Sequence, residues 1–273
     1  MSGSKFLTSI GKRLEGKVAL ITRGATGIGE TTARLFTQHG AKVVIADIQD
    51  DLGHSVCKDI GSDAASYIHC DVTNESNVKD TVDSTVSRFG KLDIMFNNAA
   101  LIDPWKAKII DNELADFDKV LGNNIRGAFL GTKHAARVMV PARQGSIINN
   151  SSVASIIDDV ASHGYVASKH ALVGLTRSTA AKLGQFGVRV NCISPFLLNS
   201  SMVKSYRFVD KDLESWMSGF GNLHGVELTA EDIALAALYF GSDESGYVSG
   251  QNFVIDGGFG SVNTVFGLFN QHP

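Results

Sequence analysis

Short apolar runs alternate with longer helical patterns along almost the whole sequence, and this alternation most constrains the fold. Continuous apolar runs are typical of strands that are buried on both faces of a parallel sheet. Such strands, when they alternate with helices, pair in parallel through right-handed crossovers. We therefore expect an α/β protein with a doubly wound parallel sheet of about seven strands and helices on both faces. The expected strands are 17–22, 42–47, 66–72, 92–99, 145–152, 188–194 and 251–258.

The segments between these strands carry the expected helices. Asn74 and Gly90 are typical of the cap and the end of a helix over 74–90. The sequence contains no internal repeat and no low-complexity stretch, so we expect residues 1–273 to form one domain. The other expected helices are 29–40, 50–61, 165–184 and 229–242, with one long helix or two over 114–140.

Charge and cysteine content limit the partners and the compartment. The net charge of −3 gives no electrostatic reason to expect nucleic acid or an anionic membrane as a partner. The cysteines Cys57, Cys70 and Cys192 are widely spaced without a CxxC, which argues against disulfides and zinc. The N-terminal residues lack the apolar core of a secretion signal, and no run is long enough to span a membrane. We expect a cytoplasmic protein without a metal.

Three glycines crowd the turn between the first strand and the first helix, in the stretch TRGATGIG (22–29). Such glycines let the backbone approach a pyrophosphate that the helix N-terminus attracts, although a plain tight turn is the alternative. Asp47 ends the second strand 18 residues after Gly29, close to the spacing of a ribose-binding acid. A carboxylate there accepts hydrogen bonds from ribose hydroxyls and repels a 2′-phosphate, which favours NAD over NADP. A solvated acid at a strand end is the alternative reading of Asp47.

Tyr165 and Lys169 are four residues apart in an expected helix and therefore project from one face. Tyrosine is a poor base at neutral pH, but a neighbouring ammonium stabilises the phenolate and lowers its pKa. A YxxxK pair alone is common on protein surfaces. The chemical reading therefore depends on the surrounding motifs.

Five motifs occur in a fixed order: TRGATGIG, CDV (70–72), NNAA (97–100), the SSV segment (151–153) and YVASK (165–169). Together they resemble the short-chain dehydrogenase/reductase family, over about residues 15–260. The segments GKLDIMFNNA, KHAARVM, RVNCISPF and YVSGQNFVIDGGF are similar to plant alcohol dehydrogenases of specialised metabolism. This branch includes secoisolariciresinol, borneol and isopiperitenol dehydrogenases and nepetalactol-related enzymes. The resemblance implies a Rossmann-type fold, NAD as the cofactor and a homotetramer.

The resemblance also implies a role for each matching residue. Ser152 would hold the substrate oxygen beside Tyr165, and Asn124 would support Lys169, with Ser151 and Asn123 as the less favoured neighbours. The implied catalytic residues are Asn124, Ser152, Tyr165 and Lys169, and the implied substrate contacts are Asn150, Ser152 and Tyr165. The implied NAD contacts are Arg23, Gly24, Gly27, Ile28, Gly29, Asp47, Asp71, Val72, Asn97, Asn98, Tyr165, Lys169, Ile193 and Pro195.

Three of these assignments have structural alternatives. Asp71, expected at the adenine amino group, could instead cap a helix, and Asn97, expected to brace the sheet, could form a turn. Asn150 could be a satisfied amide at a strand end rather than a substrate contact.

Arg23 is the main departure from the family pattern. It stands where the motif TGxxxGxG has its first glycine, and a residue with a side chain must there keep φ negative or bear strain. We expect cofactor binding to be weakened or re-tuned, with the guanidinium over the adenosine ribose or reaching Asp47. Two milder departures are Ala100, in place of the final glycine of NNAG, and Phe196, in place of the glycine after Pro195.

Two segments near the C-terminus are unusually apolar. Residues 195–228 are rich in Phe, Leu, Met and Trp, which is typical of a lid over an apolar ligand, although core packing or a subunit contact is the alternative. We expect the tail 259–273 to contact a neighbouring subunit, because free tails are usually polar.

These inferences lead to three functional hypotheses. The first is NAD-dependent oxidation of a secondary alcohol or lactol of an apolar plant metabolite, either a terpenoid (monoterpenoid or iridoid) or a phenylpropanoid-like compound. The second is a non-redox, NAD-bound cyclase or isomerase of a reactive monoterpene enol on the same scaffold. The third, an NAD-sensing binding protein, is disfavoured by the intact Asn-Ser-Tyr-Lys set.

Overall fold

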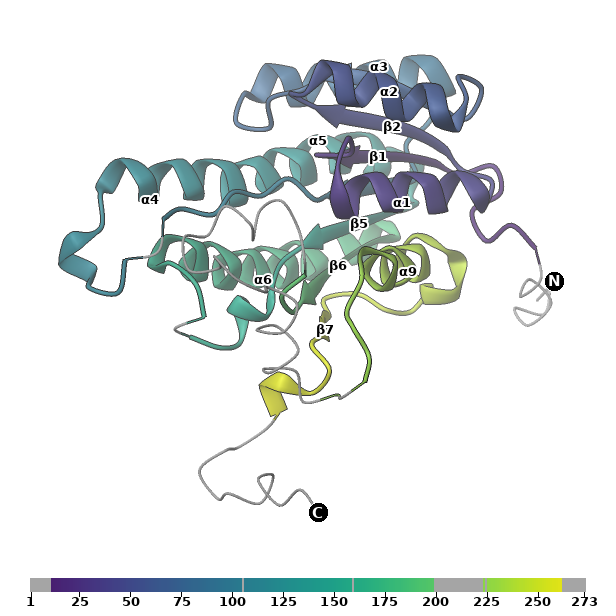
Figure 1. Cartoon of the computed structure of the whole chain (residues 1–273). Helices are drawn as coiled ribbons and strands as arrows, with labels where there is room; N and C mark the ends of the chain where they lie inside the picture. The colour runs from purple at the N-terminus through teal and green to yellow at the C-terminus, as the bar shows by residue number, and fades with distance from the viewer. Residues whose placement is uncertain (1–10, 105, 159, 199–222, 224, 262–273) are drawn as a thin grey trace.

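A parallel sheet of seven strands lies at the centre of the computed structural model, which describes residues 11–104, 106–158, 160–198, 223 and 225–261 (Figure 1). The strand order is β3-β2-β1-β4-β5-β6-β7, and every neighbouring pair is parallel. The predicted doubly wound α/β fold is therefore confirmed. The strands are β1 (Val18–Thr22), β2 (Lys42–Asp47), β3 (Ala65–His69), β4 (Ile94–Asn97), β5 (Gly145–Asn150), β6 (Val188–Pro195) and β7 (Asn252–Ile255).

Helices connect the strands at nearly the predicted positions. The side chain of Asn74 accepts hydrogen bonds from the backbone at the start of α3, and Gly90 ends that helix with φ 81°, as its sequence predicts. The helices are α1 (Gly27–Gln38), α2 (Asp50–Ile60), α3 (Glu75–Phe89), α4 (Leu114–Leu121), α5 (Ala128–Ala142), α6 (His163–Leu183) and α9 (Ala230–Gly241). Short 3₁₀ turns cover Ile109–Asp111, Val153–Ser155, Gly184–Phe186, Asp243–Ser245 and Phe259–Ser261.

Two hydrophobic layers cover the two faces of the sheet. Successive residues of a strand point to opposite faces, so Ile21 of β1 packs with Phe36 of α1 while Leu20 packs with Val82 of α3. Helices α1, α2 and α9 contribute to the first layer, and α3, α5 and α6 contribute to the second. The sheet is thus buried on both sides, which explains why its strands read as continuous apolar runs.

Four predicted strands end earlier in the structure than in the sequence analysis. The strand predicted over 66–72 stops at His69, because β3 is an edge strand that pairs only with β2 and its last partner is Asp47. The strands predicted over 92–99, 145–152 and 251–258 stop at Asn97, Asn150 and Ile255. These corrections move motif residues, Asp71 and Ser152 among them, from strands into the loops that follow.

The helical segment predicted over 114–140 is continuous but irregular. A π-helical turn, Gly122–Gly127, joins α4 to α5 without breaking the chain direction. Both alternatives, one helix or two, therefore describe part of the structure.

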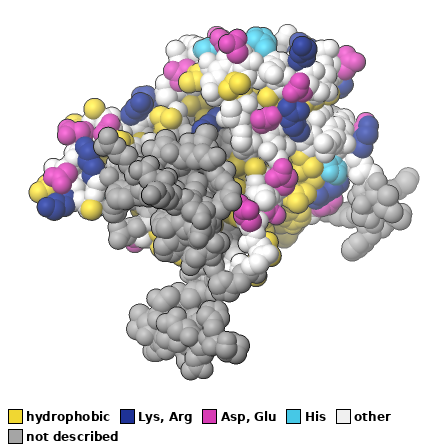
Figure 2. Space-filling view, in the orientation of Figure 1, with side chains coloured by type: hydrophobic (Ala, Val, Ile, Leu, Met, Phe, Trp, Pro, Cys, Tyr) yellow, Lys and Arg dark blue, Asp and Glu magenta, His cyan; other side chains and the backbone are white. Residues whose placement is uncertain are grey.

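The described residues include only the ends of the predicted lid and tail. Residues 199–222, 224 and 262–273, which carry most of both predictions, lie outside the described part. Within that part, none of the helices is both long and apolar enough to cross a bilayer. On the face in Figure 2, acidic and basic side chains are interspersed over the helices rather than separated by sign.

Candidate active site

Polar side chains gather where four neighbouring strands of the sheet end. The strand order reverses between β1 and β4, and ligands of open α/β sheets bind at the carboxyl ends of strands near such a point. Asp47 ends β2, Asn97 ends β4 and Asn150 ends β5, while Arg23 directly follows β1. We call this edge of the sheet, together with the first turn of α6, the crevice.

The glycine turn is folded tightly against itself and against Asn98. A Cβ added to Gly29 would lie 2.1 Å from the carbonyl oxygen of Arg23, so only glycine fits there. The Nδ2 atom of Asn98 donates to the carbonyl oxygens of both Thr22 and Arg23, at 3.1 Å each. The turn is therefore fixed from the neighbouring strand β4 as well as from within.

The same turn has the features that a nucleotide needs. Thr26 makes no capping hydrogen bond within the described residues, so the first N–H groups of α1 have no side-chain acceptor there and suit an anion. Gly27 has φ 54°, and a Cβ added there would meet nothing within 4 Å, which leaves space beside the helix end. The carboxylate of Asp47, only 3% exposed, accepts from the backbone N–H groups of Ala25 and Gln49. These residues fit a phosphate next to a ribose.

Several other predicted cofactor contacts lie around this turn. Ile28 is half-buried and packs against the core layer of α1 and α9. Asp71 accepts from the N–H and hydroxyl of Thr73 at 2.8 Å, so it shapes the loop before α3 but does not cap that helix. Val72 is buried in the opposite core layer.

Arg23 adopts a left-handed backbone conformation, with φ 50°, and so bears the strain that its sequence position implies. Its guanidinium donates to the carbonyl oxygen of Ala100 at 3.0 Å. The expectation that it reaches Asp47 is not met, because no carboxylate of the described residues lies within ion-pair distance of it. Burial lowers the pKa of Arg23, while the charges of Asp47 and Tyr165 act in the opposite direction.

The Tyr165–Lys169 pair is brought together on α6 at the crevice. The Nζ atom of Lys169 lies 5.3 Å from the centre of the Tyr165 ring and donates to the carbonyl oxygen of Asn150 at 2.8 Å. Lys169 is only 1% exposed, and burial lowers its pKa to about 7, to which the charge of Arg23 adds. A cation held against the phenol ring can stabilise a phenolate.

The two candidate serines after β5 differ in their surroundings. Ser151 is buried, and its hydroxyl donates to the carbonyl oxygen of Lys169 at 3.2 Å. Ser152 is only half-buried, and its hydroxyl accepts from the N–H of Ala154 at 3.2 Å, which leaves its own proton available. Ser152 is thus the better placed of the two to bind a substrate oxygen, as the motif implied.

Asn124 lies in the π-helical turn and joins the loop after β4 to helix α6. Its Oδ1 atom accepts from the N–H of Leu101 at 2.7 Å, and its Nδ2 atom donates to the Leu101 carbonyl and the Ser168 hydroxyl, both at 2.9 Å. Its partner in α6 is therefore Ser168, the residue before Lys169, so any support that it gives to Lys169 is indirect.

The predicted asparagines of β4 and β5 form two separate pairs. Asn97 donates from Nδ2 to Asn149 at 2.9 Å and to Thr132 of α5 at 3.2 Å, so its amide braces the sheet. Asn150 donates to Oδ1 of Asn98 at 2.8 Å, while its own buried Oδ1 atom has no partner among the described residues. Hydrogen bonds thereby connect Asn150 to Asn98, and Asn98 to the glycine turn.

The remaining predicted contacts lie on β6. The Ile193 carbonyl accepts from the N–H of Ser151 at 2.7 Å, and Pro195 ends the strand opposite Ile255 of β7. Ile193 is buried, so its contribution to the crevice is through the backbone.

Sequence reasoning missed a buried pair that holds the first turn of α6. The hydroxyl of Ser162 donates to Asp103 in a very short hydrogen bond and accepts from the N–H of Tyr165 at 3.3 Å. A serine ahead of an expected helix is a recognisable cap signal. Asp103 carries no such local signal, because its partner is 59 residues away.

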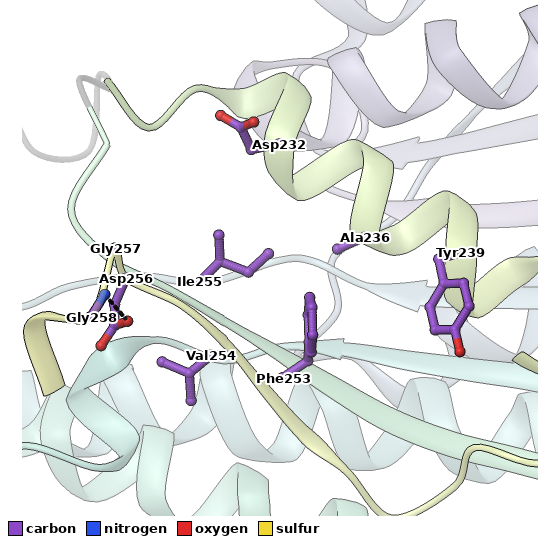
Figure 3. Close-up of a pocket in the computed structure, with 9 residues that line it drawn as sticks. All are labelled: Asp232, Ala236, Tyr239, Phe253, Val254, Ile255, Asp256, Gly257 and Gly258. Atoms are coloured by element: carbon purple, nitrogen blue, oxygen red, sulfur yellow. Dashed lines mark hydrogen bonds between the residues drawn. The ribbon is translucent and has the colours of Figure 1, made fainter. Parts of the chain in front are cut away.

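A groove of about 550 Å³ lies elsewhere, between α9 and the edge strand β7 (Figure 3). Tyr239 and Asp232 of α9 border it, and the half-exposed Phe253 of β7 points into the space between the two elements. It contains none of the residues of the crevice.

The comparisons with known proteins agree with this geometry. Residues 24–260 match the family model described as Enoyl-(Acyl carrier protein) reductase. The secoisolariciresinol dehydrogenase of Forsythia intermedia is 57% identical over 99% of this chain and 98% of its own length. The mitochondrial borneol dehydrogenase of Lavandula x intermedia is 51% identical over 95% of this chain and 96% of its own length.

A solved structure supports the same assignment. The crystal structure of levodione reductase superposes with a TM-score of 0.85 at 31% identity, covering 92% of this chain and all of the other. With the glycine turn, the Ser-Tyr-Lys residues and these relatives in agreement, the chain belongs to the short-chain dehydrogenase/reductase family and is an oxidoreductase.

Proposed function

We propose that this chain is an NAD-dependent dehydrogenase that oxidises a secondary alcohol or lactol of an apolar plant metabolite. The observation that carries the proposal is the placement of the buried Lys169 ammonium against the Tyr165 ring, at the same sheet edge as Asp47. One end of the crevice thus offers an acid for a ribose, and the other offers a proton acceptor for an alcohol.

Asp47 supports NAD rather than NADP as the cofactor. Its carboxylate is buried and fixed by two backbone N–H groups, so it cannot turn away from a ribose. A fixed negative charge accepts hydrogen bonds from two hydroxyls and repels a 2′-phosphate. The charge of Arg23 acts against this preference, but its guanidinium is bonded to the Ala100 carbonyl rather than to Asp47.

Each catalytic side chain has one task in the proposed reaction. Tyr165 takes the proton from the substrate hydroxyl, and the half-buried Ser152 donates to the substrate oxygen. Lys169 stabilises the phenolate through its position at the ring, and Asn124 fixes the neighbouring Ser168. The bound nicotinamide supplies the hydride acceptor.

The relatives support an apolar alcohol as substrate. Two of them are named as dehydrogenases of secoisolariciresinol and of borneol, which are both alcohols with a carbon-ring framework. Where the predicted lid over 195–228 is described, it contributes aromatic surface: the rings of Phe196 and Phe259 are tilted by 39° with their centres 4.6 Å apart. The cyclase hypothesis has no observation in its favour among the described residues.

We also propose that the protein is a cytoplasmic homotetramer of single-domain subunits. The half-exposed edge strand β7 and the groove that it forms with α9 offer an apolar surface for a second copy. Size-exclusion chromatography with light scattering tests the tetramer, and a monomer would contradict it.

The function is tested by following absorbance at about 340 nm with a panel of cyclic terpene alcohols, lactols and lignan alcohols. We expect the signal to grow with NAD and to grow at least about tenfold more slowly with NADP at equal concentration. Faster turnover with NADP would overturn the reading of Asp47. If the enzyme never reduces NAD but changes the stereochemistry of a spontaneously cyclising enol, the cyclase hypothesis replaces the dehydrogenase.

A further inference from the structure

Arg23 carries a charge that the described residues do not neutralise. It makes a single side-chain hydrogen bond, to the neutral carbonyl oxygen of Ala100, whereas a guanidinium has five N–H donors. The side chain is half-buried, and that burial is reflected in its lowered pKa. A desolvated cation without an anionic partner is unfavourable and attracts an anion.

The charged groups around Arg23 do not compensate its positive charge. Lys169, a second buried cation, feels the charge of Arg23. Asp47 is the carboxylate that acts on Arg23, but its oxygens are already held by the N–H groups of Ala25 and Gln49. Arg23 and, while it is protonated, Lys169 therefore share the crevice with one engaged carboxylate, and an incoming anion would offset the uncompensated charge of Arg23 at any pH.

The backbone holds Arg23 in this position despite its strain. Its carbonyl oxygen accepts from Asn98 and lies against Gly29, which leaves no room for the turn to relax. Strain of this kind persists where the surroundings enforce it, and it is often found at ligand-binding sites. The strand order β2-β1-β4-β5 places Arg23, directly after β1, between Asp47 at the end of β2 and the loop that follows β5.

We propose that Arg23 binds the 5′-diphosphate of the cofactor, exchanging the Ala100 carbonyl for phosphate oxygens. This inference rests on the proposed function, because it assumes that a dinucleotide joins Asp47 to Tyr165. Any such molecule carries its two phosphates between its two riboses, and Arg23 follows the strand that lies between β2, which ends in Asp47, and β4. The uncapped first turn of α1 supplies further N–H donors for the same anion.

A 2′-phosphate fits the position less well. That group would be attached to the ribose at Asp47, whose carboxylate repels it. The Ala100 carbonyl, to which Arg23 is bonded, belongs to the loop after β4 rather than to the loop after β2. The guanidinium therefore makes its hydrogen bond on the β4 side of β1, whereas Asp47 ends β2 on the other side.

Calorimetric titration with ADP, 2′-AMP and adenosine separates these cases. For Arg23→Met we expect the affinity for ADP to fall about 10- to 100-fold, the range of charge-assisted hydrogen bonds, with adenosine binding unchanged. The wild-type affinity for ADP should fall with added NaCl, and less steeply in Arg23→Met. Arg23→Lys should keep the salt dependence and lose part of the affinity, because lysine lacks the planar fork.

Arg143 provides the matched control. It is the other arginine with a left-handed backbone among the described residues, at φ 52°, and its side chain donates to the carbonyl oxygen of Gln185. Arg143→Met therefore removes a comparable charge and hydrogen bond, and we expect ADP binding to stay at the wild-type value. Thermal melting of each variant verifies that it is folded.

Five results would overturn the inference. Tighter ADP binding by Arg23→Met would mean that the side chain obstructs the cofactor, and weaker binding of 2′-AMP alone would assign it to the 2′-phosphate. ADP affinity equal to wild type in Arg23→Met, with NAD still bound, would refute the role of Arg23 and leave the proposed function intact. If Arg23→Met does not fold, a wild-type ADP affinity that is independent of salt refutes the role in the same way. Failure of the wild type to bind any adenine nucleotide would overturn both proposals.

Discussion

Two arginines of this chain share an uncommon backbone conformation at opposite ends of the sheet. Arg23 follows β1 with φ 50°, and Arg143 ends α5 with φ 52°, just before β5 begins. Each lies beside a glycine that could not bear a side chain, since an added Cβ at Gly29 or Gly187 would collide with the arginine carbonyl oxygen. For an L-residue this conformation costs roughly 1–2 kcal/mol.

The two positions use the same conformation differently. At Arg143 it closes a helix, where a left-handed residue is usual, and the side chain is exposed to water. At Arg23 it closes no helix, and the side chain is half-buried among charged and titratable groups. Backbone strain alone therefore says little about function, whereas the surroundings of the side chain distinguish a structural turn from a ligand-binding one.

The largest expected effect is on kcat/KM, when a tyrosine hydroxyl is removed at one end of the sheet or at the other. Tyr165→Phe removes the proposed proton acceptor at the crevice, so we expect kcat/KM to fall by a factor of about 10³ or more. Tyr247→Phe, at the opposite end beside Gln144 and Gly145, removes a fully exposed hydroxyl and should leave kcat/KM unchanged. Steady-state kinetics measure both. Wild-type turnover in Tyr165→Phe would show that Tyr165 is not the proton acceptor and that the crevice is not the catalytic end of the sheet.

A smaller effect is expected on the pH dependence of stability, where the buried Lys169 should differ from the exposed Lys182 on the same helix. Burial lowers the pKa of Lys169 from 10.5 to about 7, so between these values the unfolded chain binds a proton that the folded chain has released. Stability rises with pH wherever the unfolded state binds more protons. Lys169 should therefore raise the free energy of unfolding by up to about 1.4 kcal/mol per pH unit in this window.

Urea unfolding at about pH 7.5 and 9 measures this rise, with each variant compared with the wild type. Lys169→Met should lose roughly 2 kcal/mol of the increase. Lys182→Met, which changes an exposed lysine of α6, should keep it. The same pH dependence in wild type and Lys169→Met would show that Lys169 keeps its proton throughout.

The smallest expected effect is a gain in stability, of the same size, when either arginine is replaced by glycine. Glycine adopts the left-handed conformation freely, so Arg23→Gly and Arg143→Gly should each raise the free energy of unfolding by about 1 kcal/mol. Urea unfolding of the two variants at one pH gives the comparison. A gain at Arg143 together with a loss at Arg23 would mean that the Arg23 side chain stabilises the fold even without cofactor.

Most of the fold could be predicted because its local signals agree with its global pattern. The runs 42–47 and 17–22 read as buried strands, and both are buried in the sheet. The strand ends were less predictable, because they depend on a partner elsewhere in the sequence. β3 stops when β2 has no further residue to pair with it, and the sequence of β3 carries no mark of that.

In the candidate site, too, local features were predictable and contacts between distant residues were not. The motifs located Tyr165, Lys169, Asp47 and the glycine turn, because their spacing is local or typical of a family. The bond from Arg23 to the Ala100 carbonyl and the pairing of Ser162 with Asp103 join residues 77 and 59 positions apart, and no periodicity encodes such contacts. Sequence thus located the proposed reacting groups better than the groups that hold them in place.

The π-helical turn Gly122–Gly127 has a consequence for how the protein can vary. The turn joins α4 and α5 into one continuous helical segment whose two halves have different neighbours. Helix α4 packs on α6, and α5 packs on α3. Removing a single residue there would convert it to regular helix and rotate everything beyond it relative to the sheet. Chain length in this stretch is therefore as constrained as residue identity, and insertions or deletions are tolerable only in the loops on either side.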